Sequence, residues 1–397
     1  MARTANTWNK SPGIGAYLSV ANLCRTLSPS EVRDALEKSG KGTQRRRDLP
    51  AEAVVYYVIA MALFMHVNLR EVLYCLMEGL RMIGGVQLKV TGKSGISQAR
   101  TRIGAEPLRR LYEQHVQPVA APDTKGAWYR DKRLVSLDGS TLDIPDEPLN
   151  RKMFGGPTTF NEMSPFPQIR FVCLAEIGTH VLFAGKMADY KTNEVRLAHN
   201  VISRLTPEML CLADRGFASY ALWKQAIATG ADLLWRTRVD ILLPVEHLLP
   251  DGSYLSHLFT YRSKRLHEAP LPVRVIEYRI EGVKGCEEVT YRLITTLLDH
   301  ALYPAEELAA LYQQRWEIET AFDELKTHLR GGRLCLRSKT PELIRQEFYG
   351  LMLAHFVVRG LMYEAAHKAQ IDPDVVSFTH SLRVIRRKLP LLPAISP

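Results

Sequence analysis

The sequence has no long apolar run, no paired cysteine motif and no acidic excess. The apolar stretch Ala53–Met65 has only 13 residues, whereas roughly 20 are needed to span a bilayer. The first residues, Met1–Asn6, lack the apolar run of a signal peptide. We therefore expect a cytoplasmic protein without a membrane partner, in which Ala53–Met65 forms a buried core helix.

The six cysteines are scattered along the chain, with no C-x-x-C pair and no histidine at zinc-ligand spacing. This distribution excludes a disulfide scaffold and a zinc finger, and it predicts buried thiols in a reducing compartment. Internal repeats and low-complexity segments are also missing. The class that remains is an ordinary globular protein.

The composition favours a large basic protein with more than one packed core. Of the 397 residues, 46% are hydrophobic, and 52 Lys and Arg against 42 Asp and Glu give a formal charge of +10. A chain of this length exceeds the usual size of one domain. A polyanionic partner is the natural interpretation of the basic excess.

Four residues in the last third of the chain have a spacing that one helix would place on a single stripe. Tyr312, Arg315, Glu319 and Lys326 follow one another at intervals of 3, 4 and 7 residues. At about 100° per residue, an α-helix gathers them within an arc of roughly 60°. A carboxylate between an arginine and a lysine suits a metal ligand beside phosphate-binding cations. The pattern therefore indicates chemistry on DNA.

The spacing Y-x2-R-x3-E-x6-K resembles the signature of the IS-four family of DDE transposases from insertion sequences. Two earlier blocks extend the resemblance. The segment around Asp138, Val135–Thr141, resembles the block with the family's first catalytic aspartate, and Leu212–Phe217 resembles the block with the second, here Asp214. Because all three blocks occur in the family's order over most of the chain, the sequence is identified as a member of that family.

The resemblance implies an α/β fold, a ribonuclease H-like catalytic core interrupted by a mainly β insertion, with a helical N-terminal DNA-binding domain. It implies that Asp138, Asp214 and Glu319 are catalytic and hold two Mg²⁺ ions, for which Mn²⁺ can substitute. Two such ions bind the attacking and leaving oxygens of a phosphodiester. Double-stranded terminal inverted repeats and target DNA are the implied partners, and paired ends imply a dimer. The implied location is the bacterial cytoplasm, with association to the nucleoid when the protein is bound to DNA.

The implied activity is cut-and-paste transposition, in which the enzyme binds the inverted repeats, cleaves the element ends and joins their 3′-OH ends to target DNA. Two other functions stay open. One is a metal-dependent nuclease of the same fold without strand transfer, and the other is an inactive DNA-binding repressor. Joining of paired ends separates the first function from a plain nuclease.

Each proposed ligand has a plain alternative. Asp138 could be an ordinary strand-end residue in the turn with Gly139, and Asp143 and Asp146 compete with it nearby. Asp214 could be the N-cap of the following helix. Glu319 could simply pair with Arg315 four residues earlier, and Asp323 lies one turn beyond it on nearly the same stripe. Only the family motif separates Glu319 from Asp323.

The remaining site residues also follow from the resemblance. Tyr312, Arg315 and Lys326 are expected to contact phosphates near the scissile bond, unless they form a polar face that supports Glu319. Trp235 resembles a position where related enzymes present an aromatic ring to a flipped base. Trp316 is its rival, and both could equally be core residues.

The periodicity of the chain suggests its organisation. Short β-rich runs begin at Lys132, and the order strand, hairpin, helix, strand, helix predicts the ribonuclease H-like core. The expected strands are Leu134–Leu137, Ile169–Ala175, His180–Gly185 and Leu210–Ala213, and the expected helices are Asn193–Leu205 and Ala218–Thr229. The expected domains are a helical DNA-binding domain (1–125), a first core part (126–231), a β-rich insertion (232–298), a second core part with the Glu helix (299–347) and a helical basic segment (348–397).

The N-terminal domain offers one candidate DNA-reading helix. Ser97 could cap a short helix that presents Gln98, Arg100 and Arg102, as a helix-turn-helix reader would. A solvated basic helix is the alternative. Ser28 before Pro29, with Glu31 at the third helical position, predicts another helix start.

Overall fold

The structure is a computed structural model, and it describes residues 23–42, 49–74, 76, 92–158, 164–259, 269–279, 290–331 and 335–387. The chain divides into two compact units. The sheet unit consists of Val116–Asp323 and Tyr363–Val375, and the helical unit consists of Met1–His115, Glu324–Met362 and Val376–Pro397. Two segments with a clear sequence pattern lie outside the described residues. They are the basic run at residues 45–47, which indicates an exposed linker, and residues 282–285, where two glycines indicate a turn between strands.

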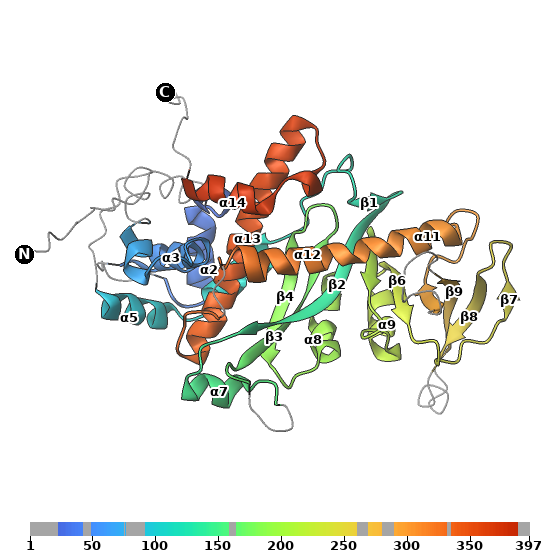
Figure 1. Cartoon of the computed structure of the whole chain (residues 1–397), viewed down its shortest axis with the longest axis horizontal. Helices are drawn as coiled ribbons and strands as arrows, with labels where there is room; N and C mark the ends of the chain where they lie inside the picture. The colour runs from blue at the N-terminus through green and yellow to red at the C-terminus, as the bar shows by residue number, and fades with distance from the viewer. Residues whose placement is uncertain are drawn as a thin grey trace, which may run out of the picture. The chain divides into compact units, whose positions relative to one another are not determined.

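The described part of the sheet unit is built on one mixed sheet of ten strands (Figure 1). Its strands are β1 (Trp128–Tyr129), β2 (Lys132–Asp143), β3 (Gln168–Glu176), β4 (Leu182–Asp189), β5 (Met209–Ala213), β6 (Asp232–Thr237), β7 (His247–Leu248), β8 (Tyr254–Leu258), β9 (Leu271–Arg279) and β10 (Thr290–Thr295). The strands follow the spatial order β4-β3-β2-β5-β6-β10-β9-β8-β7, and β1 pairs with β2.

The first five strands of that order form the ribonuclease H-like core that the sequence predicts. Strands β2, β3 and β4 pair antiparallel, and β5 and β6 continue the sheet parallel to β2. The expectation that residues 232–298 all belong to an insertion was wrong for β6, because Asp232–Thr237 pairs with β5 as the fifth core strand. The remaining strands β7 to β10 extend the same sheet antiparallel.

Helices cover both faces of the core sheet. They are α7 (Pro148–Phe154), α8 (Glu194–Val201), α9 (Tyr220–Ile227), α11 (Ala305–Tyr312) and α12 (Glu317–Asp323). In Figure 1 the orange helices α11 and α12 run across the strands. Phe322 of α12 meets Phe171 of β3 edge to face, whereas Trp223 of α9 meets Trp235 of β6. Helices α8 and α9 begin at side-chain caps from Asn193 and Ser219, as the periodicity predicts to within a few residues.

The described part of the helical unit contains helices from both ends of the chain. They are α2 (Pro29–Lys38), α3 (Ala51–Leu63), α5 (Lys93–Ile103), α6 (Glu106–His115), α14 (Phe378–Arg387) and α13 (Pro341–Ala369), which is shared with the sheet unit. Ser28 and Glu31 form the expected capping box of α2. Every residue of α3 except Glu52 is buried, which confirms the expected core helix. None of the described helices is long and apolar enough to cross a bilayer.

Helix α5 differs from the expectation in its starting point. It begins at Lys93, and Gly92 is its N-cap. Ser97 therefore lies inside the helix, where its carbonyl accepts a hydrogen bond from the Thr101 hydroxyl at 3.0 Å. The local sequence was ambiguous because serine is common both at caps and on exposed helix faces.

Among the described cysteines, Cys173 and Cys211 are buried, Cys24 and Cys335 are partly buried, and none of the four forms a disulfide. Burial raises the pKa of the Cys173 thiol well above its usual value. Cys75 and Cys286 lie outside the described residues.

Candidate functional site

Two of the predicted ligands lie side by side where parallel pairing in the sheet ends. Leu137 of β2 pairs with Ala213 of β5. The next residues in the two strands, Asp138 and Asp214, therefore occupy equivalent positions just beyond the last paired residues. Asp138 is not at the end of its strand, because β2 continues to Asp143 against β3. The two aspartates thus directly follow the last paired residues of two neighbouring parallel strands.

The signature segment is not one regular α-helix. Helix α11 ends at Tyr312, a 3-10 turn covers Gln313–Trp316, α12 covers Glu317–Asp323, and a π-helical turn follows at Glu324–His328. The 3-10 and π turns change the rotation per residue, so the regular arc calculated for an α-helix does not apply. Lys326 lies in the π-helical turn and belongs to the helical unit.

Arg315 links the first aspartate to the glutamate helix. Its Nη1 donates a hydrogen bond to Oδ2 of Asp138 at 3.1 Å, and its Nη2 lies 4.0 Å from Oε1 of Glu319. The Arg315 side chain is only 6% exposed, whereas that of Glu319 is 51% exposed. A buried guanidinium between two carboxylates is a charge-assisted arrangement that fixes their separation. It joins residues 177 positions apart in the chain.

Tyr312 is a core residue that contacts the end of β5, the strand that precedes the second aspartate. Its ring is buried in the hydrophobic cluster between the sheet and α11, and its hydroxyl donates to the Ala213 carbonyl at 3.4 Å. Ala213 is the residue before Asp214. Burial raises the pKa of the Tyr312 hydroxyl above its usual value. The side chain is thus placed to support the end of β5.

The electrostatics of the site centre on Asp138. Burial is the largest cause that raises the pKa of Asp138 to about 6, while the Gly139 backbone amide and Arg315 act against it. The charges of Glu319 and Glu194 raise the pKa further. Neighbouring carboxylates that disfavour one another's charge are typical of sites that bind a cation.

The structure also locates the competing acids. Asp143 accepts a hydrogen bond from Gln168 at 2.7 Å, and Asp146 pairs with Arg151 at 2.6 Å. Asp214 does not cap the next helix, because Ser219 does. Asp323 is exposed at the end of α12, and Glu319 is the acid on this helix that pairs with Arg315.

Three carboxylates are the oxygen donors that Mg²⁺ prefers, so the donor chemistry of Asp138, Asp214 and Glu319 fits a divalent metal. The described residues contain no group of three or more His, Cys, Asp or Glu side chains already placed around one metal position. Both oxygens of Asp138 already accept hydrogen bonds, Oδ2 from Arg315 and Oδ1 from the Gly139 amide. Metal binding by these ligands therefore requires side-chain rearrangement.

Trp235 lies on the opposite face of the sheet from Asp138. Its ring is 0% exposed and packs edge to face on Trp223 with ring centroids 5.1 Å apart. This environment favours the alternative of a core tryptophan. The rival Trp316 is 56% exposed, and the Arg315 guanidinium lies 4.7 Å from its ring centroid.

The sequence reasoning missed Arg236, which lies on the opposite face of β6 from Trp235. Trp235 pairs with Ala213, so Arg236 is the third member of the row that contains Asp138 and Asp214. The Arg236 guanidinium lies 4.3 Å from the ring centroid of Tyr291. Tyr291 stacks on Tyr278 with centroids 5.4 Å apart and planes at 21°. The alternation of side chains along a strand was the available signal.

The N-terminal candidates lie in the helical unit. Arg100 is buried and donates to Gln346 and Ser338 at 2.8 Å each. Arg102 is partly exposed and donates to the Leu49 carbonyl at 2.9 Å. Both guanidinium groups thus have partners within the unit. Gln98 is exposed on the same helix.

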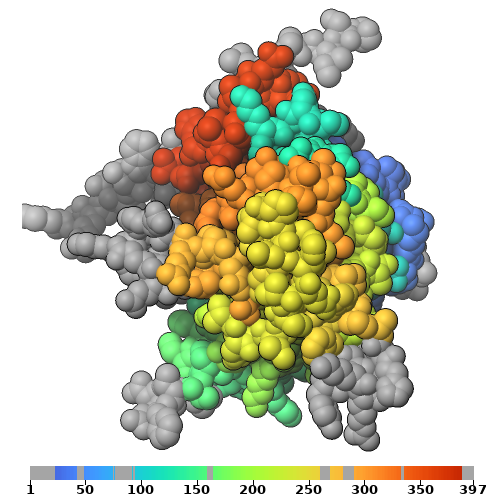
Figure 2. Space-filling model, turned by 90° about the vertical axis from the view of Figure 1, so that its right-hand side faces the viewer, coloured from blue at the N-terminus to red at the C-terminus, as the bar shows by residue number. Residues whose placement is uncertain are grey.

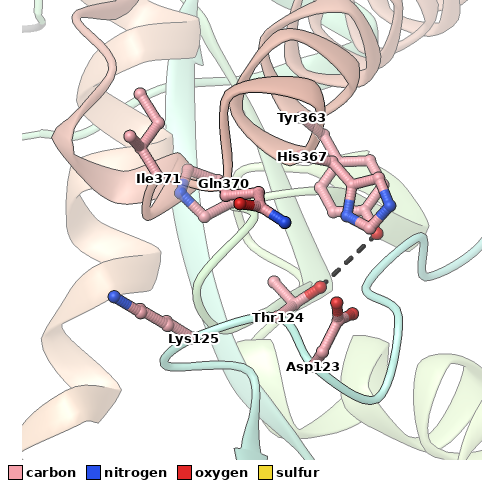
Figure 3. A pocket seen from close by; sticks show the side chains of 8 residues that line it. Asp123, Thr124, Lys125, Tyr363, His367, Gln370 and Ile371 are labelled. Carbon is pink, nitrogen blue, oxygen red and sulfur yellow. Dashed lines mark hydrogen bonds between the residues drawn. The ribbon is translucent and has the colours of Figure 1, made fainter.

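The sheet unit also contains a pocket of about 300 Å³ away from these residues (Figure 3). Asp123, Thr124, Lys125, Tyr363, His367 and Gln370 are among its lining residues. The Thr124 and Tyr363 hydroxyls lie 3.4 Å apart across it, and the Tyr363 ring stacks on His367. None of the predicted site residues lines this pocket.

Comparisons with known proteins match nearly the whole chain. Residues 17–113 match the family described as insertion element 4 transposase N-terminal, and residues 129–357 match the transposase DDE domain. The chain is 30% identical to "Transposase InsG for insertion sequence element IS4" of Escherichia coli (strain K12), over 94% of this chain and 83% of the relative. It is 35% identical to "Transposase for insertion sequence element IS421" of Escherichia coli, over 21% of this chain and 22% of the relative.

Among solved structures, the chain resembles the piggyBac transposase in its synaptic complex with hairpin DNA. The TM-score is 0.46 at 13% identity, over 96% of this chain and 81% of that one.

Proposed function

Because the chain belongs to the insertion element 4 (IS-four) family of DDE transposases, we propose that it binds the terminal inverted repeats of its element, cleaves the ends and joins the 3′-OH ends to target DNA. A DNA transposase of this family requires a divalent metal. The observation that carries the proposal is the contact of Arg315 with Asp138 and its approach to Glu319.

In this proposal Asp138, Asp214 and Glu319 hold two Mg²⁺ ions, or Mn²⁺ in their place. When bound, the metals would lower the pKa of the attacking hydroxyl or water and stabilise the leaving 3′ oxygen. The row of Asp138 and Asp214 on neighbouring strands supports this assignment. The Arg315 guanidinium would transfer from Asp138 to a phosphate oxygen as the carboxylate turns to the metal, since both partners accept its hydrogen bonds.

The other cations and aromatic residues receive separate roles. Lys326 supplies a point charge for a phosphate. Tyr312 is buried, and its hydrogen bond to Ala213 supports a role in positioning Asp214. Arg102 remains a candidate phosphate contact through its partly exposed side chain. Arg100 is assigned a structural role because its donors are engaged inside the helical unit.

Base stacking is assigned to Tyr291 in place of Trp235. Tyr291 is partly exposed and stacks on Tyr278. The Arg236 guanidinium lies over the Tyr291 ring in a cation–π contact. Aromatic rings next to cations form platforms for unpaired bases. In Figure 2 the yellow residues around β7 and β8 cover the centre of the sheet unit's exposed end, and the orange residues around α11 lie next to them. The stacked tyrosines belong to the same end of the sheet.

The two element ends must be held together for joining, so we infer a dimer in the paired-end complex. A plain nuclease with the same carboxylates would cut without joining, and a repressor would bind without cutting. The test uses purified protein, Mg²⁺, labelled inverted-repeat ends and a supercoiled target plasmid.

The expected result is a nick at the element end followed by joined product, both lost in Asp138→Asn, Asp214→Asn and Glu319→Gln while end binding persists. The matched control is Asp323→Asn, which should retain both steps. Cutting without joining would favour the nuclease. Loss of activity in Asp323→Asn but not in Glu319→Gln would overturn the third ligand.

A further inference from the structure

A fourth carboxylate approaches Asp138 from the other face of the sheet. Glu194 is the first residue of α8, directly after the Asn193 cap. A Cβ atom added at Gly139 would lie only 2.7 Å from both Cγ and Cδ of Glu194 and 3.1 Å from its Oε1. The Glu194 side chain thus occupies the space that any other residue at position 139 would fill.

The two sides of β2 explain this approach. Successive side chains of a strand point to opposite faces. Asp138 points toward α12, since it contacts Arg315, whereas position 139 faces α8. Glycine at position 139 leaves only backbone between the Glu194 carboxyl group and the aspartate.

A cation on the same face holds Glu194 in place. Nη1 of Arg170 donates to Oε1 of Glu194 at 3.1 Å. Arg170 pairs with Thr141 across β2 and β3, so it shares the face of position 139. Its guanidinium also lies 5.0 Å from the ring centroid of Tyr190. The carboxylate is therefore anchored from strand and helix together.

We propose that Glu194 is a positioning residue of the transposase site, whose charge acts through Asp138 to favour the divalent metal, and that Arg170 sets how much of that charge the site receives. The proposal rests on the metal role of Asp138 argued above. Like charges that repel across a strand gain from a shared cation, since a metal at Asp138 relieves the repulsion. Arg170 opposes this gain because it neutralises Glu194.

The proposal predicts opposite effects from the two halves of one ion pair. Glu194→Gln keeps the size of the side chain and removes its charge, so the Mg²⁺ concentration for half-maximal end cleavage should rise about tenfold, as when an outer partner of a metal ligand is lost. Arg170→Gln should lower that concentration, because Glu194 then acts unneutralised. Cleavage at saturating Mg²⁺ should stay within about twofold of the parent.

A purely structural ion pair would behave differently. Both substitutions would then weaken folding and shift the Mg²⁺ requirement in the same direction or leave it unchanged, and either outcome overturns the proposal. The second readout is the rise in melting temperature that Mg²⁺ causes in the DNA-free protein. This rise should require more Mg²⁺ in Glu194→Gln and less in Arg170→Gln.

The close approach itself is tested by a size exchange. Gly139→Ala should fold but raise the Mg²⁺ requirement, because its Cβ displaces the partly exposed Glu194 side chain from its place beside β2. Gly139→Ala with Glu194→Ala should keep the raised Mg²⁺ requirement. If the double variant instead had the same Mg²⁺ requirement as the unaltered protein, Glu194 would contribute only to packing. Failure of the proposed function looks different, since Asp138→Asn would then still cleave.

Discussion

Arg100 and Arg315 are both buried arginines, one in each unit, yet their partners give them opposite meanings. Arg100 donates to neutral oxygens of Gln346 and Ser338, and burial lowers its pKa below the usual value. Arg315 donates to Asp138 and lies near Glu319. A guanidinium with neutral partners holds a fold together, whereas one between carboxylates can exchange them for a phosphate. The identity of the partners, and not the excess of basic residues, locates the chemistry.

The difference between these two arginines also distinguishes the helical unit from the sheet unit. The helical unit gathers residues from both ends of the chain around the apolar helix α3, and its buried polar contacts join those ends. In the sheet unit, Asp138, Asp214 and Arg236 directly follow residues that pair across three neighbouring strands. Stability is therefore the expected phenotype of change in the first unit, and a selective chemical defect is expected in the second.

Removing the C-terminal segments of the helical unit should have the largest effect on folding and DNA binding. The fragment Met1–Asp123 lacks Arg386, which donates to the Leu63 carbonyl at 2.7 Å, and Gly350, where an added Cβ would lie 2.7 Å from Val58. We expect no cooperative thermal unfolding by circular dichroism and no specific end binding. Full-length Glu319→Gln is the control, and it should fold and bind. A fragment that melts cooperatively would show that the two ends are independent.

The next largest effect is expected for Trp235→Ala. It should destabilise the fold by about 3–5 kcal/mol, because it leaves a cavity where the indole ring packs against Trp223. All steps of the reaction should then decline together with the folded fraction, measured by urea unfolding and gel assays. The contrasting change, Tyr291→Ala, should cost about 1–3 kcal/mol of DNA stacking and little stability. If Trp235→Ala impaired only a step that needs an extruded base, the stacking role would return to Trp235.

Arg100→Ala should destabilise the protein by roughly 2–4 kcal/mol, because Gln346 and Ser338 lose a buried donor. DNA affinity per folded molecule should be unchanged. The matched control is Gln98→Ala on the exposed face of α5, expected to change stability by less than about 0.5 kcal/mol. Urea midpoints and end-binding titrations measure the two effects. A loss of affinity without a loss of stability would make Arg100 a DNA contact.

The smallest effect is a gain of stability that depends on pH. Folding raises the pKa of Asp138 from 3.8 to about 6, so the folded state binds the proton more tightly and loses stability as pH rises through that interval. Asp138→Asn should therefore stabilise the metal-free protein above pH about 6, by up to about 3 kcal/mol, and have little effect below pH about 4. Melting temperatures in EDTA across this range test the sign. Destabilisation at pH 8 would contradict it.

The sequence predicted the core strands and the placement of Asp138 and Asp214 on neighbouring strands, although β2 continues past Asp138 to Asp143. It failed at Trp235 for a physical reason. Leu233, Leu234 and Trp235 are all apolar since both faces of β6 are covered, so no alternation showed which face carries the site. The partly exposed stack at Tyr291 depends on the exact register of β10 on β9, which places Tyr291 opposite Tyr278. Strand periodicity does not specify that register.

The role of Arg100 could not be predicted from its neighbours. Its partners lie 238 and 246 residues away, and a basic helix looks the same whether its cations meet water, DNA or a buried amide. Arg315 was easier because the spacing of the signature already placed it beside Glu319. Distant polar contacts are thus the part of this protein that periodicity misses.

The pairing of β10 with β6 gives the chain a closed detour. The backbone leaves the core after Thr237, forms β7 to β9, and returns along β10, where Ile294 pairs with Trp235. Departure and return are neighbouring strands, so the length of the detour does not set the distance between the aspartate row and the helix of Glu319. Natural or engineered changes in β7 and β8 can accumulate there, and this end of the sheet is the place to attach a tag or a targeting module without moving the carboxylates.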